Sequence, residues 1–201
     1  GLYAAGDVAG GCPQKYVTGA LVEGEIAALD IVEKLKDQTF DITDNKEEQL
    51  LDEKVKEYNN ILSDKDSIFT IEQMEEAMQK VMDAYAGGIS SHYQFNESQL
   101  DLAKEKIEHL QVLAQNISAN DLHELMFAYE LKERLVVCLS LIEHLKARKE
   151  TRWHCFDENL DYPEKSDEWL KYVNSVKKDG KIEIITRELV GRGEVYEHSN
   201  R

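Results

Sequence analysis

Glycines and one carboxylate stand close together in the first segment of the chain, GLYAAGDVAGG. The apolar residues 2–5 are typical of a buried strand, and Gly6 and Asp7 follow where that strand would end. A helix predicted from residue 18 to residue 37 would place free backbone amides and its positive end beside the Asp7 carboxylate. Such amides bind anionic or carbonyl oxygens, and a carboxylate accepts hydrogen bonds from the hydroxyls of a sugar-like chain.

The same residues also have a purely structural explanation. Glycines are common in strand-loop-helix turns because they let the helix pack closely on the strand. The pattern of Gly6, Asp7, Gly10 and Gly11 alone therefore leaves two hypotheses open, a ligand-binding loop and a plain turn. Because the chain starts within an apolar segment, we also expect it to be the C-terminal piece of a longer protein.

The apolar pattern divides the chain into four parts, and the predicted fold class is mainly α. Residues 1–37 form the strand-loop-helix unit, and residues 38–69 form a charged linker with one exposed helix. Residues 70–150 carry apolar positions at the helical spacing of three and four. Residues 151–201 are predicted to form an extended C-terminal tail.

Three helices are predicted within the third part, at 70–86, 97–117 and 120–149. The sequence TIEQ is a capping box, and NESQ is a second cap signal. Short connections join the helices, so we predict an antiparallel three-helix bundle, preceded by the strand-loop-helix unit and followed by the tail. The apolar positions expected in its core are Ile71, Met74, Met78, Val81, Leu100, Ile107, Leu110, Leu122, Leu125, Met126 and Leu139.

Two further segments carry packing signals. The run LVVCLSLI at 135–142 is apolar on most sides of its helix, so the rest of the protein or a partner subunit is expected to cover it. In the tail, residues 181–189 alternate as a strand does, and a short helix or strand is expected near 169–173. We expect the large aromatic residues of the tail to form one cluster that packs on the bundle or against a partner. These are Trp153, Phe156, Tyr162 and Trp169.

The composition argues against several functions. The net charge is −16, from 40 acidic and 24 basic side chains, and this excess argues against a nucleic-acid partner. The longest apolar run is much shorter than the ~20 residues that span a bilayer, so we expect a chain that is not membrane-embedded. The three cysteines and six histidines show neither disulfide nor metal-binding spacing, which favours a reducing, cytoplasmic location and no metal site.

The segment GLYAAGDVAGGCPQKYVTGALVEGEIAAL resembles the second flavin-contacting segment of the flavoprotein subunits of the fumarate reductase, succinate dehydrogenase and adenylylsulfate reductase family. The stretches VMDAYAGGISSHY, DLHELMFAYELKERL and ARKETRWHCFDENLDYPEKSDEWLKYVNS are similar to the family's C-terminal helical domain and tail, in the same order. The nearest likeness is to the adenylylsulfate reductase alpha subunits. The resemblance implies FAD as the cofactor, and residues 1–37 as the C-terminal remnant of an FAD-binding α/β domain.

The resemblance also implies roles for single residues. Gly6 and Asp7 would lie at the ribityl chain of FAD, and the start of the following helix would face the pyrimidine end of the flavin. The helix residues concerned are Thr18, Gly19, Ala20 and Leu21. The family's dinucleotide-binding GxGxxG turn and its substrate-capping domain have no counterpart in these 201 residues, so the chain alone is not expected to be active.

The substrate stays open between several small anions. Adenylylsulfate reductases have a loop close to HKFSSGS, whose histidine lies near the substrate; this chain reads QKYVTGA, so Gln14 stands in that place. Succinate dehydrogenases and fumarate reductases have an arginine in this loop, and the nearest cation here is Lys15, which could bind an anionic substrate or be solvated. Adenylylsulfate, fumarate or succinate, and another small anion are the alternatives.

The function that the resemblance implies is that of an FAD-dependent oxidoreductase. Such a protein reduces or oxidises a small anionic substrate and exchanges electrons with an iron-sulfur electron-transfer subunit. The alternative, which the helical pattern of residues 70–150 also allows, is a non-catalytic helical interaction module without a cofactor.

Overall fold

A computed structural model describes residues 2–9, 16–39, 46–63 and 67–189 of the chain. The chain divides into two compact units, Gly1–Leu51 and Asp52–Arg201. The described residues are mainly helical, as predicted, with five α-helices and two small sheets of two strands each.

The first unit contains a short 3₁₀ turn, η1 (Gly6–Val8), and the helix α1 (Val17–Leu35). The helix confirms the one predicted at 18–37. The strand predicted at residues 2–5 is wrong for this chain, because no described residue pairs with its backbone and a strand needs a neighbour for its hydrogen bonds. No residue of α1 is buried, and its apolar residues, such as Leu21 at 68% exposure, face solvent.

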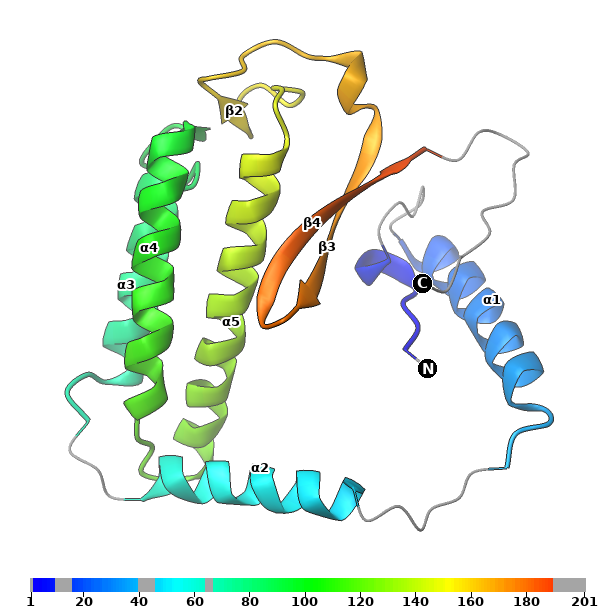
Figure 1. Cartoon of the computed structure of the whole chain (residues 1–201), viewed down its shortest axis with the longest axis vertical. Coiled ribbons are helices and arrows are strands. Elements are labelled where there is room, and N and C mark those ends of the chain that lie inside the picture. Colours follow the sequence, from blue (N-terminus) through cyan, green and yellow to red (C-terminus); the bar gives the residue numbers. More distant parts are fainter. Residues whose placement is uncertain (1, 10–15, 40–45, 64–66, 190–201) are drawn as a thin grey trace. The chain divides into compact units, whose positions relative to one another are not determined.

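The second unit is built around three helices that lie side by side (Figure 1). Both cap signals form as capping boxes. The Thr70 hydroxyl accepts a hydrogen bond from the Gln73 amide at 3.2 Å, and the Asn96 side chain does the same for Gln99 at 2.8 Å. The caps explain why the helices begin where the sequence predicts. The three are α3 (Ile71–Tyr85), α4 (Glu97–Leu113), which continues into the 3₁₀ turn η2 (Ala114–Asn116), and α5 (Leu122–Ala147).

The core of this unit lies between α3, α4 and α5, and most of its predicted members are buried. Val81 and Leu139 are half-buried beside it, whereas Leu122 and Met126 are wrong predictions, with 74% and 48% of their surface exposed. They fail because the buried stripe of α5 continues through Ala128 instead. The predicted residues that are buried are Ile71, Met74, Met78, Leu100, Ile107, Leu110 and Leu125.

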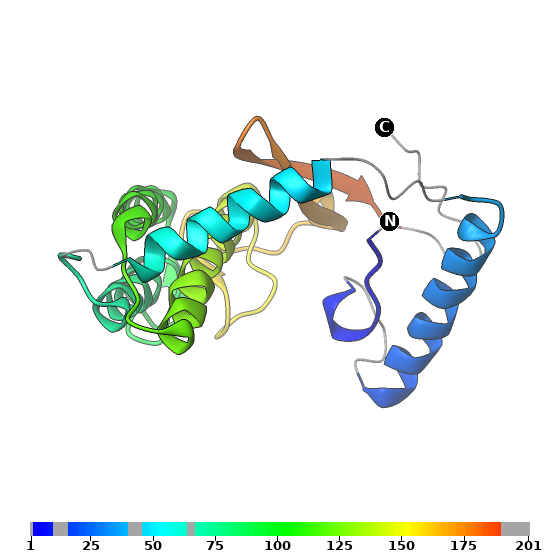
Figure 2. The same cartoon turned by 90° about the horizontal axis from the view of Figure 1, so that it is seen from below.

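The helix α2 (Lys46–Leu62) is the exposed helix predicted within 38–69, and its second half belongs to the second unit. Its end packs near the start of α5 (Figures 1 and 2). The Tyr58 and Tyr129 rings meet edge to face at 5.8 Å between centroids, and the Ala119 amide donates to the Ile61 carbonyl at 2.9 Å. Ile61 is therefore a core residue that the sparse apolar pattern of this segment did not predict.

The C-terminal part forms two small sheets. β1 (Gln94–Phe95) pairs in parallel with β2 (Glu158–Asn159), which ties the tail to the loop before α4. The turn η3 (Asp167–Trp169) leads into a hairpin of β3 (Lys171–Lys178) and β4 (Lys181–Glu188), which packs against α5 (Figure 1). The strand predicted at 181–189 is confirmed as β4.

The predicted aromatic cluster of the tail does not form among the described residues. Phe156 lies beside Tyr93, with 6.3 Å between ring centroids. Two further rings lie next to cations: the Lys149 ammonium is 5.1 Å from the Tyr162 ring centre, and the Arg148 guanidinium is 5.9 Å from that of Trp169. Phe156, Tyr162 and Trp169 thus have different neighbours.

Candidate functional site

Gly6 fixes the approach of the first loop to helix α1. It is buried and has φ +74°, a conformation that other residues adopt only under strain. A Cβ atom at this position would lie 3.2 Å from the Cβ of Ala20, in the first turn of the helix. The Gly6 amide donates to Glu23 Oε2 at 2.7 Å. Glycine is therefore required here by both its backbone angle and its close contact.

The N-terminus of α1 offers backbone amides that have no partner among the described residues. Tyr16 is the N-cap residue and provides no side-chain cap, and the first amide bonded within the helix is that of Ala20, to the Tyr16 carbonyl at 3.1 Å. No side chain among the described residues accepts from the amides of residues 17–19. Together with the positive end of the helix, these donors suit a carbonyl or anionic oxygen.

The other predicted site residues of this region lie in the same loop or at the start of α1, and most of them are exposed. Asp7 follows Gly6 directly, in the turn η1 that packs on α1, and its side chain is exposed. Thr18 and Leu21 are exposed and Gly19 is half-buried. Gln14 and Lys15, the residues predicted to meet the substrate, lie outside the described residues.

A second set of contacts, which the sequence interpretation missed, connects residues 2–5 to the middle of α1. The Tyr3 hydroxyl donates to Asp30 Oδ2 at 2.6 Å, and Lys34 Nζ lies 2.7 Å from the same carboxylate. The hydrogen bonds from Lys34 and then from Tyr3 lower the pKa of Asp30. The spacing of four residues between Asp30 and Lys34 predicts an ion pair on a helix. The contact of Tyr3 with Asp30 depends on the fold and is not predictable from spacing.

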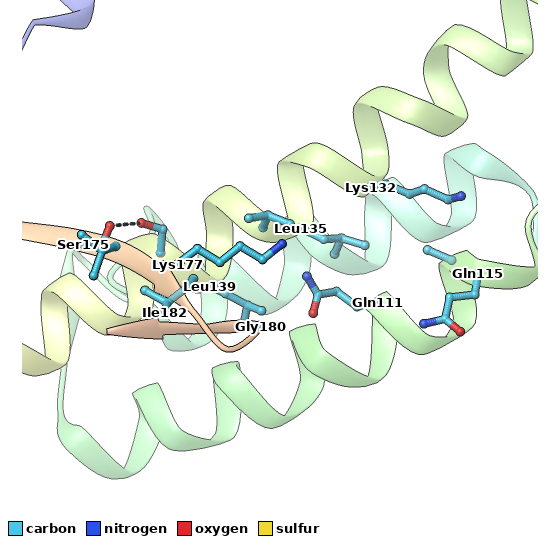
Figure 3. Close-up of a pocket in the computed structure, with 13 residues that line it drawn as sticks. Gln111, Gln115, Lys132, Leu135, Leu139, Ser175, Lys177, Gly180 and Ile182 are labelled. Atoms are coloured by element: carbon cyan, nitrogen blue, oxygen red, sulfur yellow. Dashed lines mark hydrogen bonds between the residues drawn. The ribbon is translucent and has the colours of Figure 1, made fainter. Parts of the chain in front are cut away.

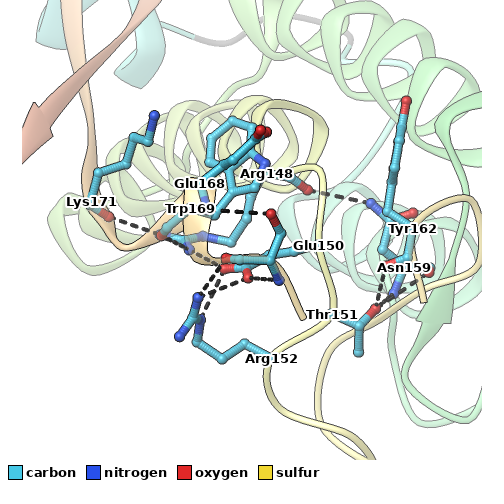
Figure 4. A network of polar contacts seen from close by, with 10 residues as sticks. Arg148, Glu150, Thr151, Arg152, Asn159, Tyr162, Glu168, Trp169 and Lys171 are labelled. Atoms are coloured by element: carbon cyan, nitrogen blue, oxygen red, sulfur yellow. Dashed lines mark hydrogen bonds and ion pairs between the residues drawn. The ribbon is translucent and has the colours of Figure 1, made fainter. Parts of the chain in front are cut away.

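The end of α5 carries the densest polar network of the second unit (Figure 4). Glu150 is buried, and three side-chain or backbone groups donate to its carboxylate. Arg148 Nη1 lies 2.6 Å from Oε1, Arg152 Nη2 lies 2.8 Å from Oε2, and the Ser166 amide lies 2.9 Å from Oε2. The fully paired carboxylate joins the helix end to the tail.

The network determines the charge of Glu150 and the start of the hairpin. Burial alone would raise the Glu150 pKa, but the bonds from Arg152, the Ser166 amide and Arg148 outweigh it and lower the pKa to about 2. Arg148 also donates to the carbonyls of Trp169 and Lys171, at 3.0 and 3.2 Å. In the sequence the RKETR segment is visible only as a family likeness, and its buried ionic contacts are not predictable from it.

Comparison with known proteins decides the family. Residues 75–197, more than half of the chain, match the C-terminal region of the fumarate reductase flavoproteins. The chain belongs to this family. The matched region includes α4, α5 and the Glu150 network, so these elements form part of the C-terminal domain of a family of flavoprotein oxidoreductases.

Two relatives and one solved structure extend this result. The chain is 32% identical to adenylylsulfate reductase subunit alpha of Megalodesulfovibrio gigas over 108 residues, which are 51% of this chain and 16% of that protein. It is 29% identical to an uncharacterized FAD-dependent oxidoreductase of Methanocaldococcus jannaschii over 175 residues, which are 84% of this chain and 30% of that one. Adenylylsulfate reductase of Archaeoglobus fulgidus matches with a TM-score of 0.82 and 31% identity, over 96% of this chain and 32% of that one.

The chain therefore spans at most about a third of the length of these fumarate reductase family relatives. The A. fulgidus match covers 96% of the chain, so it includes most of residues 1–37 together with the helical part. No described helix is both long and apolar enough to cross a membrane. Among the described residues, no three His, Cys, Asp or Glu side chains gather as metal ligands would.

Proposed function

We propose that this chain contributes one side of the flavin site of an FAD-dependent oxidoreductase. In this proposal residues 1–37 contact the cofactor, the C-terminal helices form a bundle domain, and the tail encloses the end of that bundle. The observation that carries the proposal is the first loop. Gly6, at positive φ and in contact with Ala20, holds the turn that carries the exposed Asp7 against α1, whose first amides have no side-chain cap among the described residues.

The described residues fit FAD chemically. The Asp7 carboxylate can accept hydrogen bonds from the ribityl hydroxyls, and the backbone amides of Thr18 and Gly19 can donate toward the pyrimidine carbonyls. Ala20, whose own amide bonds to Tyr16, and Leu21 would line the same helix start. Bound FAD would supply hydride and electron transfer. The residues of this chain bind and orient it. The positive end of α1 would favour negative charge on a group bound there.

The wider assembly follows from the same proposal. We infer a small anionic substrate, with Lys15 and Gln14 as the residues of this chain nearest to it, and electron exchange with an iron-sulfur subunit. The relative from M. gigas is named as the alpha subunit of its enzyme, which supports an assembly of several subunits. A cytoplasmic location remains part of the proposal. The choice between adenylylsulfate, fumarate or succinate, and another anion remains open.

A substitution at Asp7 distinguishes the flavin-binding proposal from the alternative of a helical interaction module. In the complete flavoprotein, Asp7→Ala removes a charge-assisted hydrogen bond, so FAD affinity should fall by about tenfold. The matched control is Asp37→Ala, an exposed carboxylate after the end of α1. FAD content after gel filtration and the dissociation constant from flavin fluorescence give the measurement. Equal affinity in the Asp7 and Asp37 variants would favour the interaction module.

A further inference from the structure

A cavity of about 560 Å³ lies between the end of α4, the middle of α5 and the β3–β4 hairpin (Figure 3). All three elements belong to the second unit. Its lining is largely apolar, with Leu135 and Leu139 from α5 and Ile182 from β4. A volume of this size and an apolar surface are typical of small-molecule sites, which add a few placed polar groups for orientation.

The polar groups of this cavity are cationic or neutral. Lys132 and Lys177 line it together with Gln111 and Gln115, and no aspartate or glutamate does. The chain as a whole has 40 acidic and 24 basic side chains. The charged residues that line the cavity are nevertheless both lysines, so its charge is opposite in sign to the net charge of the chain. Figure 3 shows the Lys177 ammonium end lying toward Gln111 over the apolar residues. The local potential therefore favours an anion.

These donors are largely unused. Among the described residues, Lys177 has no carboxylate partner, and the carboxamides of Gln111 and Gln115 make no hydrogen bond. Lys132 lies 3.5 Å from Glu57, but that carboxylate has a nearer cation in Lys54, at 2.8 Å. An entering carboxylate would therefore meet Lys177 without first displacing a protein carboxylate.

We propose that this cavity binds a small organic carboxylate with an apolar body. The apolar body would cover Leu135, Leu139 and Ile182, and the carboxylate would bind Lys177 with help from the Gln111 amide. A hydrated inorganic anion would leave the apolar lining in contact with water, so the apolar body is part of the recognition. The site lies in the helical unit and does not depend on the proposed flavin contact.

The test uses the full 201-residue chain and two probes that differ only in charge. Isothermal titration with 4-phenylbutyrate should show one saturable site in the millimolar range or tighter, and the neutral 4-phenylbutyramide should bind at least about tenfold more weakly. Lys177→Gln should lower the affinity for 4-phenylbutyrate by about tenfold and leave the affinity for 4-phenylbutyramide unchanged. The matched control Lys181→Gln, in the same hairpin but outside the lining, should leave both affinities unchanged.

A second variant tests the apolar part and guards against misfolding. Val136 lines the cavity from α5 and is exposed to solvent, so Val136→Glu should leave the circular dichroism and thermal unfolding nearly unchanged while it abolishes binding of both probes. Equal affinities for 4-phenylbutyrate and its amide would overturn the proposal. So would unchanged binding in Lys177→Gln, or the absence of any saturable binding by the folded chain.

Discussion

At the scale of single residues, Gly6 is the position on which the proposed flavin contact depends most. Gly6→Ala would place a Cβ in a left-handed conformation and 3.2 Å from Ala20, which costs about 1–2 kcal/mol. We expect FAD affinity of the complete flavoprotein to fall by about five- to thirtyfold. Gly24→Ala is the matched control, since Gly24 lies within α1 with open space around it and should tolerate a methyl group. Equal FAD affinity in the two variants would show that the loop is not held by this contact.

Glu150 gives the chain a specific dependence on acid. Its pKa is lowered from 4.5 to about 2 in the folded chain, so its ionic bonds contribute stability that is complete above the unfolded value and is lost as the pH falls toward 2. Near neutral pH, Glu150→Gln should lower the free energy of unfolding by about 1.5–3 kcal/mol. The difference between wild type and variant should shrink steadily below pH 4.5 in urea titrations.

The control for this prediction is Glu168→Gln, an exposed carboxylate of the same tail. It should change stability by less than about 0.5 kcal/mol at every pH. A Glu150→Gln effect that stays constant from neutral pH down to the acid limit would mean that the contribution of Glu150 does not come from its charge.

At the scale of elements, the helices of the second unit were predictable because their signals are local. The TIEQ box and the apolar spacing of α3 and α4 lie within single stretches of sequence, and the structure places both helices within a few residues of the prediction. Residues 2–5 show the opposite case. A strand exists only if another segment pairs with it, and no local pattern in this chain reports whether that segment is present.

The same distinction explains the tail. The Asp179-Gly180 turn between β3 and β4 is a hairpin signal that was present in the sequence but was not used, whereas β4 was found from its alternation. The contacts of Arg148 with Trp169 and Lys171 could not be predicted, because they join the end of α5 to backbone carbonyls about twenty residues away. Among the predicted site residues, Gly6 is the one for which the residue type itself indicates the local structure, a tight turn in close contact with a helix.

A central core position tests the packing of these elements. Ile107 of α4 has no exposed surface, so Ile107→Ala should lower the free energy of unfolding of the 201-residue chain by about 2–5 kcal/mol. Val112 of the same helix is exposed and its truncation to alanine should cost less than about 0.5 kcal/mol. Urea unfolding followed by circular dichroism measures both. Similar losses in the two variants would contradict the assignment of the buried face of α4.

At the scale of the whole molecule, the two units differ in how much of their apolar surface they bury. The second unit has its own core between three helices, whereas α1 in the first unit buries none of its residues and exposes most of its apolar side chains. In the proposed function these side chains are covered by the remainder of an FAD domain. The relatives are long enough to hold further domains, because this chain spans at most about a third of their length.

Hydrogen exchange of the complete flavoprotein, with and without FAD, tests the central claim most directly. If the start of α1 donates to the flavin, the amides of residues 17–19, which have no partner among the described residues, should exchange at least about tenfold more slowly when FAD is bound. The core amides of α4 should change much less. Unchanged exchange at residues 17–19 on saturation with FAD would contradict the account, because it would place the flavin away from this helix end.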